Sequence, residues 1–202
     1  MEKMSEKHVS IIERLRCYSG FYRLECLKLK HRLFSGQMSD AISREVILRQ
    51  NAVCVLPYDP VRGEVVLLEQ FRIGAFVQGR NPWLLEQVAG LIDDGEMPEQ
   101  TAYREAKEEA DLILSKLHAV LNYYPSPGGS SEYVHLFVGC CSTKDAGGIH
   151  GLISEGEDIK VHVLSIKEAL QALSDGKIDN AATIITLQWL ALNGDKLKEQ
   201  WI

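Results

Sequence analysis

A cysteine pattern is missing from this sequence, although five cysteines are present. Their number is odd, no CxxC spacing occurs, and no histidines follow at zinc-finger intervals. These absences exclude a disulfide framework and a structural zinc module. We therefore expect reduced thiols that pack as small apolar side chains.

Long apolar runs and an excess of positive charge are also missing. No run approaches the roughly 18 apolar residues of a membrane span, and the start MEKMSEKHVS lacks the apolar core of a signal peptide. With 22 basic and 28 acidic residues, the net charge of −6 disfavours nucleic acid and anionic membranes as partners. The sequence predicts a soluble cytoplasmic protein, in which an anionic substrate would need local arginines or metal ions.

What is present is the composition of an ordinary globular protein, with 202 residues of which 46% are hydrophobic. That length suits one domain, or one domain with an appended arm. Residues 21–34 alternate apolar and basic side chains, SGQMSD follows as a turn, and residues 42–50 return as a second strand. We expect an antiparallel meander arm in residues 1–50 and a main domain in residues 51–202.

The main domain mixes strands and helices without a regular βαβ repeat. A hairpin is predicted around the turn PVRG, and the segments expected as strands or apolar runs are 52–59, 64–73, 83–92, 118–124, 132–140 and 158–166. The expected helices are 98–110, 167–176 and 180–194, of which the last two end at Gly176 and Gly194. This order predicts a layered α/β domain of the α+β type.

Eight acidic side chains crowd the segment GLIDDGEMPEQTAYREAKEEADL, residues 90–112. Glu105 and Glu109 share one face of the expected helix, where like charges repel by a few tenths of a kcal/mol. Clustered, half-sheltered carboxylates take up protons or bind hard cations, and a site of oxygen ligands alone favours Mg²⁺ or Mn²⁺. On spacing alone, a solvated glutamate-rich face remains the alternative.

A stripe of alanines on this helix supports the sheltered interpretation. Ala102, Ala106 and Ala110 fall on one face and let the helix lie close to a sheet. The carboxylates lie beside this stripe, at the edge of the contact. Arg104 can pair with Glu108 one turn later, which would orient that carboxylate.

The spacing of the whole segment resembles the Nudix box, the loop–helix–loop signature of hydrolases that act on nucleoside diphosphates linked to another group. Six positions match the family's identities at the family's spacing: Gly90, Glu96, Arg104, Glu105, Glu108 and Glu109. The family's glycine near the end of the box is Asp111 here, and an aliphatic position is the small Ala106. Because the glycine position often needs a positive φ, and Asp tolerates it better than most residues, we expect a cost of about 1 kcal/mol and no loss of chemistry.

The resemblance extends along nearly the whole chain. The segments HRLFSGQMS, WLLEQVAG, SPGGSSE, GIHGL, EDIKVHV and GKIDNAATIITLQWL look like those of the bacterial ADP-ribose pyrophosphatase branch, and Pro127 falls at that branch's marker position. The resemblance implies an α/β/α sandwich with a mixed sheet. It also implies hydrolysis of ADP-ribose to AMP and ribose 5-phosphate through metal-assisted attack of water.

The resemblance also implies a site with two or three Mg²⁺ ions, for which Mn²⁺ can substitute. Its implied metal ligands are the carbonyl of Ala89 and the carboxylates of Glu96, Glu105, Glu108, Glu109 and Glu157. Glu155, in the acidic loop SEGEDIK, would activate or position the attacking water, so that the catalytic group comprises Glu155, Glu105, Glu109 and Arg104. An ordinary acidic surface loop is the alternative for residues 154–158.

Substrate contacts are expected from three places. Arg72 suits a diphosphate, with an ordinary surface salt bridge as the alternative. The turn SPGGSSE offers backbone N–H groups at Gly128 and the carboxylate of Glu132 to sugar hydroxyls. In the arm, the nucleotide base or the phosphates of the substrate would contact Phe21, Arg44 and Glu45. The alternative for Phe21 is a core residue, because a lone aromatic is often buried.

The family's arm is exchanged between subunits, so we expect a homodimer in which the arm residues serve the neighbouring site. Two other functions remain open. One is hydrolysis of another nucleoside diphosphate sugar, such as GDP-mannose. The other is a catalytically silent ADP-ribose-binding module, which should have lost box glutamates or carry a DNA-binding domain.

Overall fold

The structure is a computed structural model that describes residues 4–202. It divides into two compact units. One unit comprises the chain up to Gln50 together with Tyr124–Tyr133, and the other comprises Asn51–Tyr123 and Val134–Ile202. The segment of residues 124–133, which the sequence placed in the main domain, therefore packs with the N-terminal unit.

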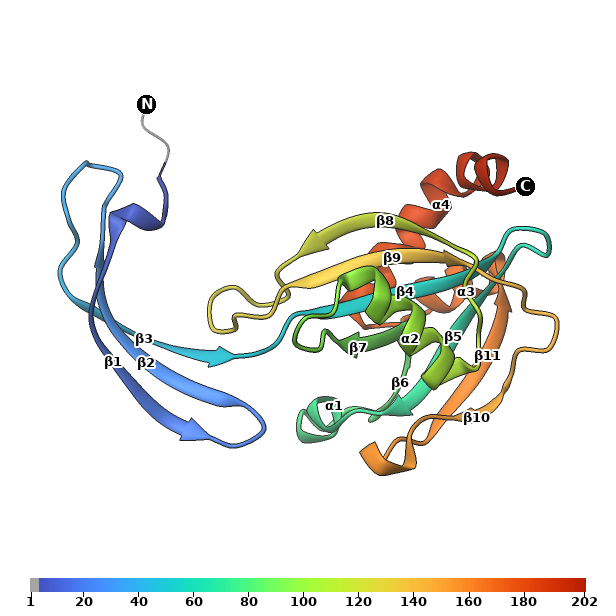
Figure 1. The fold of residues 1–202 in the computed structure, drawn as a ribbon, viewed down its shortest axis with the longest axis horizontal. Helices are drawn as coiled ribbons and strands as arrows, with labels where there is room; N and C mark the ends of the chain where they lie inside the picture. The colour runs from blue at the N-terminus through green and yellow to red at the C-terminus, as the bar shows by residue number, and fades with distance from the viewer. Residues whose placement is uncertain (1–3) are drawn as a thin grey trace. The chain divides into compact units, whose positions relative to one another are not determined.

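The N-terminal unit is an antiparallel sheet in the order β1-β2-β3 (Figure 1). After the 3-10 turn η1 (Glu6–His8), its strands are β1 (Val9–Ser19), β2 (Arg23–His31) and β3 (Ile42–Leu48). The predicted meander is confirmed for β2 and β3, but β1 was missed. Register shifts between Ile11 and Glu13 and between Arg16 and Tyr18 break the period-2 pattern that would have revealed it.

Residues 124–133 join this unit through the end of β3. The backbone N–H of Ile47 donates to the carbonyl of Gly129 at 2.9 Å, and Ser131 N–H donates to the carbonyl of Ile47 at 3.0 Å. Arg49 and Glu132 form an ion pair at 3.1 Å. These contacts make a turn-rich segment, distant in sequence, part of the arm.

The second unit is built on a mixed sheet in the order β10-β11-β5-β4-β9-β8, with β6 paired to β5 and β7 paired to β4. Only the β4–β9 pair is parallel. The strand bounds are β4 Ala52–Asp59, β5 Glu64–Phe71, β6 Trp83–Glu86, β7 Val88–Leu91, β8 Lys116–Tyr123, β9 Val134–Cys140, β10 Gly148–His150 and β11 Ile159–Ser165. The predicted mixed α/β fold is confirmed.

Strands β4 and β5 pair only near their shared turn, at Tyr58 with Val65 and Asp59 with Glu64. Beyond that point β6 pairs with β5, and β7 pairs with β4. The apolar run predicted over residues 83–92 is therefore two short strands, which change partner at Gln87. This break places the backbone around Gln87 in the middle of the sheet.

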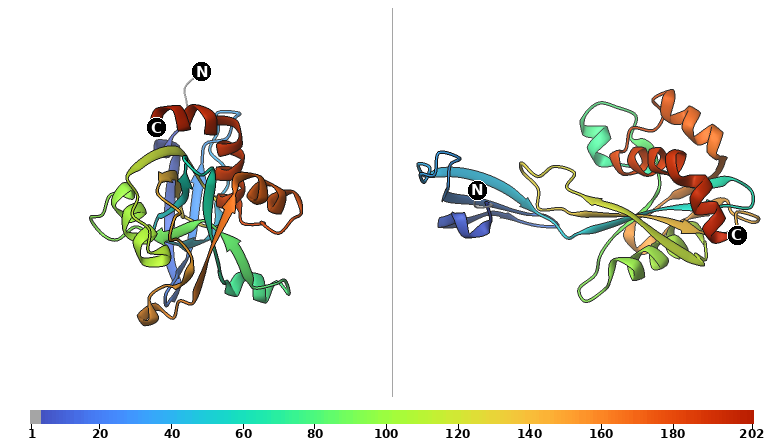
Figure 2. Two further views of the ribbon diagram at one scale, coloured as in Figure 1. Left: turned by 90° about the vertical axis from the view of Figure 1, so that its right-hand side faces the viewer. Right: turned by 90° about the horizontal axis from the view of Figure 1, so that it is seen from above.

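Helices cover both faces of this sheet (Figure 2). On one face lies α2 (Pro98–Ala110), whose alanine stripe is fully buried against the sheet in one core cluster. On the other face α3 (Ile166–Ser174) and α4 (Ala181–Trp201) bury a second cluster. The remaining elements are α1 (Ile73–Val77) and the 3-10 turn η2 (Ile153–Glu155). The α/β/α sandwich is confirmed.

The end of α4 differs from the sequence prediction. Gly194 was expected to stop this helix, yet α4 continues to Trp201. Leu197 beyond it is buried in the second core cluster and Trp201 packs against that cluster. Burying one such side chain contributes about 2 kcal/mol, which outweighs the cost of about 1 kcal/mol for a glycine inside a helix.

Two further expectations can be compared with the structure. All five cysteines are free thiols. No helix within residues 4–202 is long and apolar enough to span a membrane.

Candidate active site

The acidic helix lies directly against β7. A Cβ atom built on Gly90 would stand 1.7 Å from Oε1 and 2.0 Å from Cδ of Glu105. No side chain fits in that space, so the glycine is required for the Glu105 carboxylate to lie over the backbone of the strand. Gly90, the first residue of the box motif, thus leaves the space that the carboxylate of Glu105, near the end of the motif, occupies.

Arg104 is the centre of the acidic cluster. Its Nε and Nη2 donate to the two oxygens of Glu96 at 3.1 and 3.0 Å. Its Nη1 donates to Glu105 at 2.7 Å and to Glu108 at 3.0 Å. The predicted pair of Arg104 with Glu108 is confirmed, and the same guanidinium also fixes two other carboxylates.

Glu96 has both oxygens engaged. Besides the two bonds from Arg104, it accepts a hydrogen bond from Thr101 Oγ1 at 2.8 Å. The bonds from Arg104 and then Thr101 lower the pKa of this carboxyl from 4.5 to about 2. Glu96 is therefore an anion at any ordinary pH, and it is bound to the arginine of the box.

Glu105 and Glu109 lie in the opposite electrostatic situation. Burial raises the pKa of Glu105 to about 7, because it outweighs the attraction of Arg104, and the charges of Glu108 and Glu157 raise it further. Burial also raises the pKa of Glu109, which is 2% exposed, to about 8, with Glu105 and Glu157 adding to the effect. Such carboxylates either take up protons or bind cations.

Ala89 stands next to Glu109. Its backbone N–H donates to Glu109 Oε2 at 2.9 Å, which opposes part of the rise in pKa. Ala89 lies in β7 opposite Cys54 of β4. Ala89, whose carbonyl was expected to bind metal, is thus in contact with Glu109, which is one of the expected carboxylate ligands.

The two glutamates of the acidic loop behave differently. Glu157 accepts a hydrogen bond from the backbone N–H of Leu152 at 2.9 Å, and its charge is among those that raise the pKa values of Glu105 and Glu109. Glu155 is exposed at the end of η2. The structure therefore brings Glu157, but not Glu155, into electrostatic contact with the box helix.

The donor set fits a hard divalent cation. The oxygen donors are the carboxylates of Glu105, Glu108, Glu109 and Glu157. Glu109 is buried and Glu105 half-buried, both with raised pKa values, and oxygen donors are what Mg²⁺ and Mn²⁺ select. Within residues 4–202, no three histidine, cysteine or acidic side chains already stand close enough to hold an ion. Oxygens of Glu105 and Glu108 accept hydrogen bonds from Arg104.

The end of the helix follows the expectation for the atypical box residue. Asp111 caps α2 at φ 53°, ψ 31°, in the left-handed region, and is the one non-glycine residue with positive φ in the described part of the chain. Its carboxylate forms an ion pair with Lys107, which lowers its pKa. Aspartate therefore adopts here the left-handed conformation that the family's glycine position was expected to need.

Arg72 lies at the end of β5 and is bound to a buried partner. Its Nε donates to Glu86 Oε2 at 2.8 Å, and Glu86 is 4% exposed. Burial lowers the pKa of Arg72, but the charge and hydrogen bond of Glu86 outweigh it and raise the pKa overall. The pair thus joins a guanidinium whose side chain is 40% exposed to a buried carboxylate. Sequence reasoning missed Glu86, although a charged residue inside the apolar run WLLEQVAG was a signal.

The arm residues that were expected to contact the nucleotide base of the substrate lie in the N-terminal unit. Phe21 is 82% exposed and contacts the ring of Tyr22 edge-on, with 4.9 Å between ring centroids. It is therefore not a core residue. Arg44 donates to the carbonyl of Ser43 at 2.8 Å, and Glu45 is exposed on the same strand.

The turn residues that were expected to contact sugar hydroxyls of the substrate also belong to the N-terminal unit. Gly128 lies in the turn of residues 127–129, with open space where a side chain would be. Glu132 is held by Arg49. The structure thus groups Gly128 and Glu132 with the arm residues, and Arg72 with the unit that carries the box.

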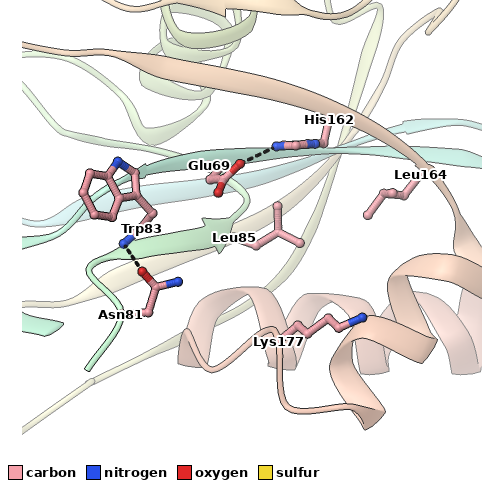
Figure 3. Close-up of a pocket in the computed structure, with 7 residues that line it drawn as sticks. All are labelled: Glu69, Asn81, Trp83, Leu85, His162, Leu164 and Lys177. Carbon is pink, nitrogen blue, oxygen red and sulfur yellow. Dashed lines mark hydrogen bonds and ion pairs between the residues drawn. The ribbon is translucent and has the colours of Figure 1, made fainter. Parts of the chain in front are cut away.

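A cavity of about 240 Å³ lies elsewhere in the second unit (Figure 3). It is bounded by β5, β6 and β11 and by Lys177 after α3, and its polar wall is the pair Glu69–His162, 2.9 Å apart. Leu85 and Leu164 of its lining pack with the core under α3 and α4. The cavity is therefore on the sheet face opposite α2, and is not part of the box site.

The fold and the acidic helix now define the class. The NUDIX domain matches residues 48–186, and the chain belongs to this family. Its members typically depend on a divalent metal. The chain is 51% identical over 193 residues to the ADP-ribose pyrophosphatase of Escherichia coli (strain K12), covering 96% of this chain and 92% of that protein.

The chain is also similar to a second group of pyrophosphatases and to a solved structure. The chain is 38% identical over 157 residues to the GDP-mannose pyrophosphatase of Cronobacter sakazakii (strain ATCC BAA-894), covering 75% of this chain and 78% of that protein. A solved structure described as an ADP compounds hydrolase superposes with a TM-score of 0.68 over 95% of this chain and 99% of that one. At 21% identity, the latter likeness supports the fold alone.

Proposed function

We propose that this chain hydrolyses ADP-ribose to AMP and ribose 5-phosphate. The observation that carries the proposal is the pair of box-helix carboxylates with raised pKa values, the half-buried Glu105 and the buried Glu109, in a chain 51% identical to an ADP-ribose pyrophosphatase. Water adds to one phosphorus, the bridging P–O bond breaks, and its electron pair leaves with the other phosphate. The protons of the water are released to a base and to solvent.

The proposed metal is Mg²⁺, in two or three ions, with Mn²⁺ as a substitute. Glu105, Glu108, Glu109 and Glu157 would hold it together with the carbonyl of Ala89. When bound, the metal neutralises the diphosphate and makes water more acidic. Because Arg104 holds Glu105 and Glu108, these side chains must turn away from the guanidinium. Glu96, bound through both oxygens, keeps Arg104 in place, and we assign it this anchoring role first.

Glu155 is the proposed base. It is exposed in the same loop as Glu157, whose charge acts on Glu105 and Glu109, so a movement of this loop would carry both glutamates toward the helix. Arg72 is the proposed contact of the diphosphate, because guanidinium groups bind phosphate oxygens in a fixed geometry. Gly128 and Glu132 are proposed for the sugar.

We further propose a homodimer in which the arm of one subunit serves the site of the other. β1 is exposed along its whole length, including the apolar side chains of Ile11, Ile12, Leu15 and Tyr18. Exposed apolar surface of this kind marks an interaction site. Phe21, Arg44 and Glu45 would then contact the base of the substrate. Size-exclusion chromatography with light scattering tests this, and a micromolar monomer with full ADP-ribose activity would contradict it.

The second candidate substrate is GDP-mannose, which the 38% identity to a GDP-mannose pyrophosphatase favours. Both candidates need the same box, and they differ in the contacts to base and sugar. A silent binding module is disfavoured because every box glutamate is present.

The test of the proposed function is a screen of nucleoside diphosphate derivatives with Mg²⁺. We expect AMP from ADP-ribose, with little GMP from GDP-mannose and roughly 10²-fold less product or lower still from a Glu109→Gln variant. Equal or greater release of GMP would indicate that GDP-mannose, and not ADP-ribose, is the substrate. No release from any compound by the wild type would contradict the assignment as a hydrolase.

A further inference from the structure

Glu86 is a buried carboxylate that the box does not explain. It ends β6 at the break before Gln87, where the sheet changes partner from β5 to β4. At 4% exposure, an isolated anion would be strongly disfavoured unless it were paired and hydrogen-bonded. Both of its oxygens are in fact bound, each by a different element of the fold.

One oxygen of Glu86 fixes Arg72. Oε2 accepts from Nε of Arg72 at 2.8 Å, while neither terminal nitrogen of Arg72 is hydrogen-bonded to a residue that the structure describes. A bond at Nε sets the plane of the guanidinium and leaves its terminal fork unoccupied, the part that matches phosphate oxygens. The charge of Glu109 also acts on Arg72, so this fork lies within electrostatic reach of the box helix.

The other oxygen of Glu86 is fixed by α4. Oε1 accepts from Nδ2 of Asn180 at 2.9 Å. Asn180 is the N-cap of α4, and its own oxygen accepts from Thr183 N–H and Oγ1, both at 3.1 Å. Thr183 Oγ1 in turn accepts from the backbone N–H of Gln87 at 3.0 Å. The start of a long helix, whose N-terminus favours negative charge, thus holds Glu86 from the other face of the sheet.

We propose that Glu86, held by Asn180, is a positioning residue that presents the terminal nitrogens of Arg72 to the diphosphate of the substrate. This inference rests on the proposed function, in which Arg72 contacts the diphosphate. Glu86 touches no reacting atom, and it acts through the orientation of Arg72. A diphosphate is charged before and during reaction, so the loss of this orientation weakens ground-state binding more than it slows turnover.

The test is a double-mutant cycle between Glu86→Gln and Arg72→Ala, read as KM and kcat for ADP-ribose. We expect Glu86→Gln to raise KM about tenfold with kcat within about threefold of wild type. Because Glu86 acts through Arg72, adding Glu86→Gln to Arg72→Ala should raise KM little further. Additive effects on KM, or a loss confined to kcat, would overturn the proposal.

Asn180→Ser provides a second variant that does not remove the carboxylate. Serine is a good N-cap, so α4 keeps its start, but its side chain is too short to replace the bond from Nδ2 to Glu86. We expect a rise in KM of about threefold in the same direction, which also vanishes in the Arg72→Ala background. A matched control is Glu69→Gln, a carboxylate of β5 bound to His162 on the opposite sheet face, whose KM should be unchanged.

A calorimetric measurement separates this proposal from the proposed function. The affinity of the wild type and the same variants for inorganic pyrophosphate with Mg²⁺ should follow the pattern of KM. If the wild type hydrolyses no ADP-ribose, the proposed function fails. The double-mutant cycle can then still be measured as the affinity for pyrophosphate, and it decides the role of Glu86. If pyrophosphate binds equally to wild type and Glu86→Gln, the positioning role fails, whatever the substrate.

Discussion

Replacing Glu109 by glutamine should make the metal-free protein more stable and inactive at once. In the folded protein burial raises the pKa of Glu109 from 4.5 to about 8, so at pH 7 folding forces this carboxyl to take up a proton. Glutamine is neutral, has nearly the same shape, and can still accept the hydrogen bond from Ala89 N–H. The variant therefore avoids a cost that the wild type bears.

The size of the effect follows from proton linkage. At pH 7 the unfolded-state pKa lies about 2.5 pH units below the pH, and each unit corresponds to about 1.4 kcal/mol, so Glu109 costs on the order of 3 kcal/mol. Because the folded-state pKa is raised, the wild type loses no stability below pH 4.5 and loses it progressively as the pH rises toward 8. The two proteins should thus be about equally stable at and below pH 4.5, and the difference between them should grow as the pH rises and level off above about pH 8.

The assay is urea unfolding of the full chain in EDTA at several pH values and one protein concentration. Added Mg²⁺ should raise the free energy of unfolding of the wild type and raise that of Glu109→Gln less, since ligands stabilise the state that binds them. Turnover of Glu109→Gln should fall by roughly 10²-fold or more, because one charge at the metal is lost. Glu99→Gln, an exposed change on the same helix, is the control and should alter stability by about 0.5 kcal/mol or less.

Two results would refute this reasoning. A Glu109→Gln protein that is less stable than wild type in EDTA at pH 7, or whose difference does not shrink toward pH 4.5, would show that Glu109 is not a buried, uncompensated carboxyl. Near-normal turnover of the variant at ordinary Mg²⁺ would remove Glu109 from the proposed ligand set.

Three further predictions concern single residues. Gly90→Ala should lower kcat by about 10-fold or more without loss of secondary structure by circular dichroism, because the new methyl displaces Glu105; unchanged kcat would contradict the steric role. Gly194→Ala, inside α4 with ordinary contacts around the new methyl, should stabilise the fold by about 0.5–1 kcal/mol in thermal unfolding and leave kcat unchanged, and a destabilised variant would mean that the glycine is needed there. Glu155→Gln should lose turnover yet retain Mg²⁺ and substrate binding by calorimetry, whereas an active Glu155→Gln beside an inactive Glu157→Gln would reverse the two loop assignments.

Local spacing in the sequence was sufficient to predict the box and its helix. The alanine stripe fixed which face of α2 is buried, and Asp111 was expected to be left-handed and is. These features depend on residues a few positions apart, where helical periodicity and steric rules act directly. The pattern of expected strands and helices predicted the mixed α/β class, whereas the family was predicted from the resemblance of the box motif to the Nudix box.

Local rules failed where contacts outside the segment decided the outcome. β1 was missed because two register shifts in its pairing with β2 break the alternation, and these shifts exist only in the paired sheet. α4 runs past Gly194 because residues beyond the glycine are buried by other elements. Residues 124–133 belong with the arm through hydrogen bonds to β3, more than seventy residues earlier.

The chemical character of the site was decided by tertiary structure. The sequence supplied Glu105 and Glu109, but their raised pKa values come from burial beneath the sheet and from Glu157 in a distant loop. Arg72 was recognisable as a cation, whereas its orientation depends on Glu86 and Asn180, which lie 94 positions apart in the chain. Desolvation and hydrogen-bond geometry depend on which groups surround an atom in space, and spacing along the chain does not carry that information.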